Sequence, residues 1–240
     1  MTISEITPNL FIGGREAMLA LTGSESALIE SGYRGIINCA GGEFQLSSAL
    51  LTPVGGDTGL TREVNNDTDD KQIFLLELPI EDKSDRLDSK LDEYFTQILS
   101  FLTSIFNLPF PSPQSSSARS ETKLTKHHPC SREHELEERG KEKEGEGEEK
   151  NKKKVLIGCA AGVSRSVSVA LAFLIHTQHM SLHEAFTLVR SKRPFAYPNS
   201  QFWLYLMDLE QRVRGRRTVS LNAIEMHVVR PGPYFFSSLR

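Results

Sequence analysis

Residues 152–176, KKKVLIGCAAGVSRSVSVALAFLIH, are the feature that most constrains how this chain can fold. A short apolar run ends at Cys159 and is followed by a loop of small residues. Residues 163–177 are then rich in Val, Ala and Leu, which indicates a helix. A strand, a tight loop and a helix in this order indicate a strand that belongs to a parallel sheet covered by helices.

Strand and helix patterns alternate along the rest of the chain. Strands are expected in short apolar runs, at residues 6–14, 34–40, 73–80 and 155–159. Helices are expected where apolar side chains follow helical spacing, at residues 15–33 as a broken segment, 87–106, 163–177, after Ser181, and 200–213. Ser181 followed by Glu184 predicts a capping box at the start of one helix. The alternation predicts an α/β fold with a central, mostly parallel sheet flanked by helices.

Two polar stretches interrupt the predicted domain. Residues 47–72 include GGDTGLTREVNNDTDD and are expected to form a long surface loop. Residues 111–154 have almost no apolar side chains to bury, so nothing offsets the entropy of ordering them, and we expect a disordered, charged insertion. The elements on both sides of this insertion need each other. We therefore predict one catalytic domain over residues 1–212 and a C-terminal tail over residues 213–240.

Composition and charge argue against several classes of function. The net charge is −3, so no global basic field indicates a nucleic-acid partner. No apolar run reaches the roughly 18 residues that a membrane span needs, and the N-terminus lacks the pattern of a signal peptide. Three cysteines are too few for a disulfide framework, which favours a reducing intracellular compartment. We expect a cytoplasmic monomer, with KNKKK and RVRGRR as weak candidates for nuclear import.

The sequence gives little reason to expect a metal or another cofactor. His127, His128 and Cys130 lie together in the predicted insertion. No second pair of ligands has the spacing of a zinc site, so we expect no metal there.

The residues from Cys159 to Arg165 have the composition of an anion-binding loop. A lone cysteine is more often a packing residue, so a chemical role for Cys159 has to be inferred from the residues around it. Where a strand leads into a helix, successive backbone N–H groups can point inward, and the helix N-terminus adds partial positive charge. Gly162 allows close approach of the backbone to a ligand, and Arg165 can hold two phosphate oxygens with its planar fork.

The same positive field acts on the thiol of Cys159. A cysteine at a helix N-terminus beside an arginine is expected to be a thiolate near neutral pH. A thiolate that faces a bound phosphate can attack phosphorus and form a phosphocysteine. The leaving oxygen then needs a proton, so a carboxylic acid must come from elsewhere in the chain.

This segment resembles the catalytic loop of the dual-specificity protein phosphatases, in the cysteine-based protein tyrosine phosphatase superfamily. Residues 159–166 match the family pattern Cys-x-x-Gly-x-Ser-Arg-Ser. The resemblance continues in the strands ITPNLFIGG and GIINCA, in the acid loop and helix LELPIEDKSDRLDSKLDEYF, and in MSLHEAFTLVRSKRPFAYPNSQF. It covers most of residues 3–210 apart from the two polar stretches. The resemblance implies a protein tyrosine phosphatase-like fold of the small, atypical dual-specificity type.

The resemblance also implies a role for each matching residue. Cys159 would be the nucleophile, Arg165 would bind phosphate and stabilise the transition state, and Ser166 would assist departure of the thiolate. The implied phosphate-binding backbone amides are those of Ala160, Ala161, Gly162, Val163 and Ser164. Asp82 aligns with the general acid, and Asp85 and Asp88 are close rivals for that role.

The expected function is hydrolysis of phosphotyrosine, phosphoserine and phosphothreonine in proteins. Relatives that act on phosphoinositides tend to carry lysines in the loop, and this loop has none. Gly158 stands where the family has histidine, and we expect its presence to reduce activity because that histidine helps to organise the loop. Gly158 therefore keeps open an alternative, a pseudophosphatase that binds phosphoproteins as a scaffold. A phosphatase for lipid, RNA or glucan is a third reading, which the lysine-free loop disfavours.

Cys39 has two interpretations. A small, buried apolar residue at the end of a strand is the simpler one. In some lipid-phosphatase relatives, a cysteine near this position pairs with the nucleophile under oxidation. The resemblance therefore also suggests a Cys39–Cys159 disulfide.

Overall fold

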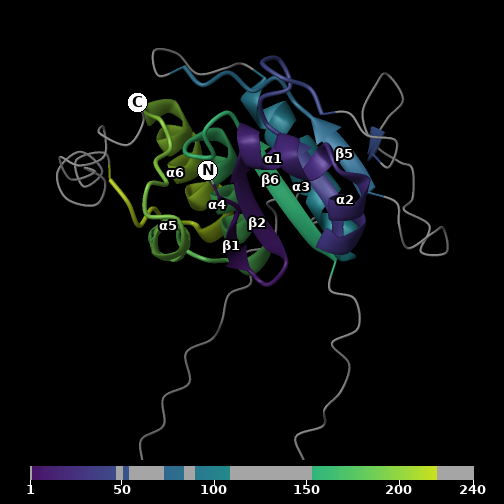
Figure 1. The fold of residues 1–240 in the computed structure, drawn as a ribbon. Helices are drawn as coiled ribbons and strands as arrows, with labels where there is room; N and C mark the ends of the chain where they lie inside the picture. The colour runs from purple at the N-terminus through teal and green to yellow at the C-terminus, as the bar shows by residue number, and fades with distance from the viewer. Residues whose placement is uncertain (1, 47–50, 54–72, 84–89, 109–152, 221–240) are drawn as a thin grey trace, which may run out of the picture. The chain divides into compact units, whose positions relative to one another are not determined.

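Six strands form one sheet, in the order β1-β2-β6-β3-β5-β4 (Figure 1). The computed structural model describes residues 2–46, 51–53, 73–83, 90–108 and 153–220. All of these residues belong to one compact unit, made of Met1–Pro109 and Asn151–Arg240. A second unit, Phe110–Lys150, contains none of the described residues. The strands are β1 (Ser4–Thr7), β2 (Leu10–Gly14), β3 (Tyr33–Asn38), β4 (Leu51–Pro53), β5 (Ile73–Glu77) and β6 (Lys154–Cys159).

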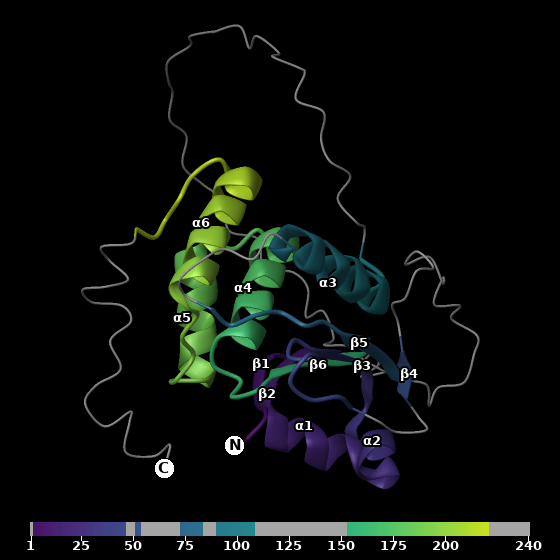
Figure 2. The ribbon, with the colours of Figure 1, turned by 90° about the horizontal axis from the view of Figure 1, so that it is seen from above.

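Helices cover both faces of the sheet (Figure 2). The helices are α1 (Arg15–Thr22), α2 (Glu25–Ser31), α3 (Leu91–Phe106), α4 (Arg165–Gln178), α5 (Leu182–Lys192) and α6 (Ser200–Arg214). α1 and α2 lie on one face, and α3 to α6 lie on the other. Among the strands of the described residues, β1 runs antiparallel to β2, and the other neighbouring pairs are parallel. The predicted α/β fold, with a mostly parallel sheet flanked by helices, is confirmed.

β6 occupies the interior of the sheet between β2 and β3. Val155, Leu156 and Ile157 are fully buried because helices cover both faces. A parallel strand covered on both sides needs an apolar side chain at almost every position, which is the pattern that VLI presents. Cys159 ends the strand at its carboxyl end, where the loop to α4 begins.

Several predicted boundaries are wrong. Residues 6–14 form a hairpin of two strands rather than one strand, because the chain turns between Thr7 and Leu10. The predicted loop 47–72 contains β4, a three-residue edge strand that pairs with β5 through its backbone, so no side-chain pattern marks it. The predicted insertion 111–154 ends too late, since Lys154 opens β6. The rest of both polar stretches lies outside the described residues.

The ends of α4 and α6 also differ from the prediction. α4 begins at Arg165 rather than Val163, since the preceding residues form the loop. α6 continues to Arg214, beyond the predicted domain end at 212. The buried carboxylate of Glu210 then accepts hydrogen bonds from the backbone of Leu182 and of Thr218, at 2.9 and 2.8 Å. The first residues of the predicted tail 213–240 are therefore packed against the domain.

The predicted capping box at the start of α5 is confirmed. The hydroxyl of Ser181 accepts a hydrogen bond from the backbone N–H of Glu184 at 3.2 Å. The Glu184 carboxylate accepts one in return from the backbone N–H of Ser181 at 2.8 Å. The two groups satisfy donors that a helix N-terminus otherwise leaves unpaired.

Met18 of α1 fills the space that a side chain at residue 158 would occupy. A Cβ atom built on Gly158 would lie 1.4 Å from Sδ of Met18 and 2.6 Å from its Cε. Met18 is fully buried, so its thioether has no open space to move into. The glycine before Cys159 is therefore required by the packing of α1 against β6.

Gly158→Ala should lower the free energy of unfolding by about 1–3 kcal/mol, because the new methyl group overlaps Met18. In Gly158→Ala/Met18→Ala the loss should be smaller than the sum of the two single losses, since the smaller side chain removes the overlap. Urea unfolding of the four proteins measures this coupling. Gly42→Ala is a matched control, because its Cβ would meet only Pro79 Cβ at 3.4 Å and Pro79 Cα at 3.9 Å. Additive losses at 158 and 18 would contradict the steric account.

Candidate active site

The loop between β6 and α4 folds around the sulfur of Cys159. Sγ accepts a hydrogen bond from the backbone N–H of Gly162 at 3.2 Å and lies 3.3 Å from the hydroxyl of Ser166. Gly162 has a φ of +68°, a conformation that favours glycine. A Cβ there would also lie 2.3 Å from the Arg193 guanidinium and 2.7 Å from the carbonyl oxygen of Gly13. The structure thus brings the predicted nucleophile and the predicted loop glycine together.

Four successive carbonyl groups of this loop are bound by donors from outside it. Those of Ala160 and Val163 accept backbone N–H bonds from Arg15 and Tyr197, at 2.9 and 2.8 Å. Those of Gly162 and Ala161 accept bonds from Nε and Nη2 of Arg193, at 2.6 and 3.4 Å. Carbonyl groups held away from the loop centre leave the N–H groups to line it, which is the arrangement of an anion-binding nest.

Arg193 is a functional residue that the sequence reasoning missed. Its side chain is fully buried, and it also donates to the hydroxyl of Ser4 at 2.9 Å. Burial lowers the pKa of Arg193 from its usual value, whereas the negative charge of Cys159 acts in the opposite direction. The one sequence signal that could have pointed to Arg193 is its place in the run SKRPFAYPN, which breaks the helix.

Arg165 lies at the start of α4, 5% exposed, with carboxylates on two sides. Its Nη1 donates to the carboxylate of Glu43 and to the carbonyl oxygen of Ile80, the latter at 3.2 Å. Its Nε lies 3.7 Å from Oδ2 of Asp82 and makes no hydrogen bond. Burial by itself would lower the pKa of Arg165, but Glu43, Cys159 and Asp82 raise it above its usual value. The guanidinium is a fixed cation whose printed hydrogen bonds use Nη1, which leaves Nε and Nη2 as donors for a ligand. Nothing in the sequence marked Glu43 as its partner.

Asp82 is held against the loop by two side-chain donors. Its Oδ1 accepts hydrogen bonds from the Ser164 hydroxyl at 2.8 Å and from Nδ2 of Asn199 at 2.6 Å. Asn199 is also the N-cap of α6, where its Oδ1 accepts from the backbone of Gln201 and Phe202. The rivals Asp85 and Asp88 lie outside the described residues. Asp82 therefore stands next to Arg165 with Oδ1 occupied and Oδ2 facing the guanidinium.

Cys39 directly follows β3, the strand that pairs with β6, and so lies near the end of β6 where Cys159 is placed. β3 and β6 pair in parallel with Asn38 opposite Gly158, and the backbone N–H of Cys39 donates to Gly158 O at 2.8 Å. Both Cys39 and Cys159 are buried and free. Burial, followed by the charge of Cys159, raises the pKa of the Cys39 thiol well above its ordinary value.

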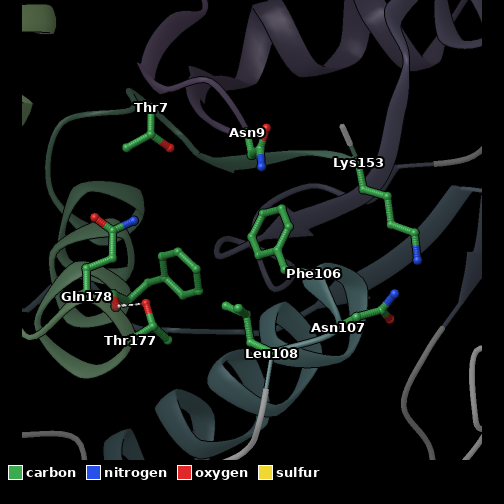
Figure 3. A pocket seen from close by; sticks show the side chains of 9 residues that line it. Thr7, Asn9, Phe106, Asn107, Leu108, Lys153, Thr177 and Gln178 are labelled. Atoms are coloured by element: carbon green, nitrogen blue, oxygen red, sulfur yellow. Dashed lines mark hydrogen bonds between the residues drawn. The ribbon is translucent and has the colours of Figure 1, made fainter. Parts of the chain in front are cut away.

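A cavity of about 450 Å³ opens at the other end of β6 (Figure 3). Thr7 at the end of β1, Asn9 in the turn to β2, and Lys153 just before β6 form one side of it. The ends of α3 and α4 form the other, with Phe106 and Phe173 packed at 5.5 Å between ring centroids. None of the predicted site residues lines this cavity, so the chemistry of Cys159 is separate from it.

Within the described ranges, no group of three His, Cys, Asp or Glu side chains is placed to hold a metal ion. His127, His128 and Cys130 lie outside those ranges. None of the helices that the structure describes combines the length and apolarity that a membrane-spanning helix needs.

Residues 146–212 match the model of the dual specificity phosphatase catalytic domain. Dual specificity protein phosphatase Mpk3 of Drosophila melanogaster is 48% identical over 62 residues, which are 26% of this chain and 15% of that protein. Human dual specificity protein phosphatase 14 is 41% identical over 66 residues, 28% of this chain and 33% of the relative. The chain thus spans well under half the length of these curated relatives.

Several solved structures resemble the fold of this chain. A mouse putative dual specificity phosphatase, crystallised with zinc tungstate, has a TM-score of 0.54 at 19% identity and covers 89% of both chains. The human tyrosine phosphatase-like serine/threonine/tyrosine-interacting protein has a TM-score of 0.51 at 17% identity, over 87% of this chain and 95% of the other. At these identities the likeness is one of fold. Residues 146–212 are therefore similar to the dual specificity phosphatase catalytic domain, and the fold of the described residues resembles that of these solved structures.

Proposed function

We propose that this chain hydrolyses phosphate monoesters of tyrosine, serine and threonine in proteins through a phosphocysteine intermediate. The observation that carries the proposal is the loop after Cys159, in which the carbonyl groups of residues 160–163 are bound by donors outside the loop and a backbone N–H points at the Cys159 sulfur. Backbone N–H groups and Arg165 can then hold the three phosphate oxygens that do not react. Similarity to the dual specificity phosphatases supports the same activity.

In the first step, the Cys159 thiolate attacks phosphorus. A sulfur–phosphorus bond forms, and the bond from phosphorus to the ester oxygen breaks. That oxygen takes a proton from Asp82, which must enter the step as a carboxylic acid. Because Oδ1 of Asp82 is anchored by Ser164 and Asn199, Oδ2 is the oxygen that carries this proton.

In the second step, water attacks the phosphocysteine. Asp82, now a carboxylate, accepts a proton from the attacking water, and the phosphorus–sulfur bond breaks to release phosphate. The sulfur leaves as a thiolate, and the Ser166 hydroxyl, 3.3 Å from Sγ, can donate a hydrogen bond to it. Arg165 balances the charge on the phosphoryl oxygens in both steps.

The loop favours phosphoprotein substrates over lipid headgroups. Residues 160–164 contain no lysine or arginine that could neutralise the additional phosphates of a polyphosphorylated headgroup. Arg165 is the loop's cation, and its charge is shared with Glu43 and Asp82. Such a site can therefore neutralise the charge of one phosphate monoester but not that of several phosphates.

Wild-type protein should release phosphate from para-nitrophenyl phosphate and from a phosphotyrosine peptide, and Cys159→Ser should lose at least about a thousandfold in kcat. Phosphate release over pH 5–8 measures both, with a phosphoinositide as the third substrate. Binding of the peptide without turnover by the wild type would instead support the scaffold alternative. Faster turnover of the phosphoinositide would replace the proposed substrate class.

Asn199→Ser should selectively weaken general-acid catalysis. Serine still caps α6, so the fold is retained, but it lacks the amide that donates to Asp82. Hydrolysis of phenyl phosphate, whose leaving group needs the proton, should fall by about tenfold. Hydrolysis of para-nitrophenyl phosphate, whose leaving group is a stable anion, should change little. Equal losses with both esters, or a lowered Tm, would assign Asn199 a merely structural role.

We also propose Cys39 as the redox partner of Cys159. Peroxide oxidises the Cys159 thiolate to a sulfenic acid, Cys39 sulfur then attacks it, and water leaves as the disulfide forms. The raised pKa of Cys39 keeps it a thiol, so this second reaction should be the slow one.

After mild peroxide, intact mass should fall by two hydrogens in the wild type, and dithiothreitol should restore activity. In Cys39→Ala, the oxidised protein should instead gain oxygen atoms and recover poorly. An unchanged mass in oxidised, inactive wild type would exclude the pair.

A further inference from the structure

The cavity at the amino end of β6 is a second concave site, apart from the phosphate-binding loop. Its volume of about 450 Å³ falls in the range of about 300–1,000 Å³ that small-molecule sites occupy in proteins. Lys153 lines the cavity just before β6, whereas Cys159 ends the strand. At about 3.3 Å per residue, the strand separates these two residues by roughly 20 Å. The cavity is therefore free for a ligand that the proposed phosphatase chemistry does not use.

The apolar part of the cavity is built from two aromatic rings. Phe106, at the end of α3, and Phe173, in α4, have ring centroids 5.5 Å apart and planes inclined at 47°. Phe173 is buried and Phe106 is partly buried, so the core holds the pair in place. Leu108 adds an aliphatic side chain beside them. Inclined rings offer both a face and an edge to a third ring, so this part of the cavity suits a planar aromatic group.

The polar part of the cavity consists mainly of side-chain amides. Asn9, Asn107 and Gln178 all line it, and the amide of Asn9 points toward the ring of Phe106 (Figure 3). The hydroxyl of Thr177 donates to the carbonyl oxygen of Phe173 at 2.7 Å, so its proton is already used. The amides are therefore the neutral groups that can donate N–H bonds to the polar end of a ligand.

Lys153 gives the cavity its charge. It is the one charged residue among the nine that line the cavity, and no carboxylate lies among them. Within the residues that the structure describes, no carboxylate forms an ion pair with Lys153. An ammonium group without a partner attracts a negative group on a bound molecule. One ammonium balances the single charge of a carboxylate, whereas a phosphate monoester would bring a second negative charge.

We infer that this cavity binds a small aromatic carboxylate. The ring of the ligand packs on Phe106 and Phe173, and its carboxylate accepts hydrogen bonds from Lys153 and from the amide of Asn9. This inference goes beyond the proposed function and does not depend on it, because none of the residues assigned to phosphate hydrolysis lines the cavity.

The test compares 2-naphthoate with 2-naphthamide, a ligand of nearly the same shape without the charge. Isothermal titration calorimetry of the full chain gives the dissociation constant of each. Wild type should bind naphthoate about two- to fivefold more tightly than naphthamide, the ratio expected of one partly exposed charge pair. Lys153→Gln should bring this ratio close to one. No binding of naphthoate by the wild type, or an unchanged ratio in Lys153→Gln, would overturn the inference.

Lys154→Gln is the matched control. It removes the same charge one residue later, but the ammonium of Lys154 lies 5.9 Å from the centre of the Phe11 ring, and Lys154 does not line the cavity. The preference for naphthoate should survive in this variant. An equal loss of preference in Lys153→Gln and Lys154→Gln would reveal a general effect of net charge and would reject a specific contact with Lys153.

A second measurement locates the bound ligand, because an aromatic carboxylate can also enter the loop after Cys159 as a mimic of a phosphate ester. Naphthoate should shift the backbone amide resonances of Leu108, Thr177 and Gln178 in NMR spectra of the wild type. Shifts confined to residues 160–166 would place naphthoate in the loop and overturn the inference. Turnover of para-nitrophenyl phosphate tests the proposed function separately, so the two can fail independently.

Discussion

A loop can offer its N–H groups to an anion only if its carbonyl groups are bound elsewhere. In this protein that requirement is met by three segments: Arg15 at the start of α1, Arg193 after α5, and Tyr197 before α6. Each is far from the loop in sequence, so the site exists only once the sheet and its helices have assembled. The buried Arg193 contributes most, because one side chain binds two successive carbonyl groups and also ties the loop to β1.

The charges of the site then limit how it can take up phosphate. The negative groups Glu43, Asp82 and Cys159 surround one guanidinium, that of Arg165. A phosphate dianion in the loop would add negative charge to this cluster, so the backbone N–H groups of the loop would have to supply part of its stabilisation.

Much of the architecture follows from local patterns in the sequence. Three local patterns predicted elements correctly: the apolar run before Cys159, the helical spacing of α3 and the pair Ser181–Glu184. Each pattern depends on residues that lie close together in the chain. β4 has no such signal, because a three-residue edge strand is held by the backbone of its neighbour.

The predicted site residues Cys159, Gly162, Arg165 and Ser166 lie within one segment of eight residues, and the pattern of that segment was enough to find them. The residues that support them could not be found in this way. Glu43, Arg193 and Asn199 act through contacts between distant segments, and each has an ordinary residue type at an unremarkable spacing. Asp82 could be chosen over its rivals only by resemblance, since three aspartates within seven residues look alike in sequence.

The contact between Met18 and Gly158 has a consequence for which substitutions this chain accepts. No side chain fits at residue 158 while the thioether lies there, so the two positions cannot change independently. A side chain such as histidine could stand before Cys159 only together with a smaller residue at position 18, so a substitution at either position changes what the other can tolerate.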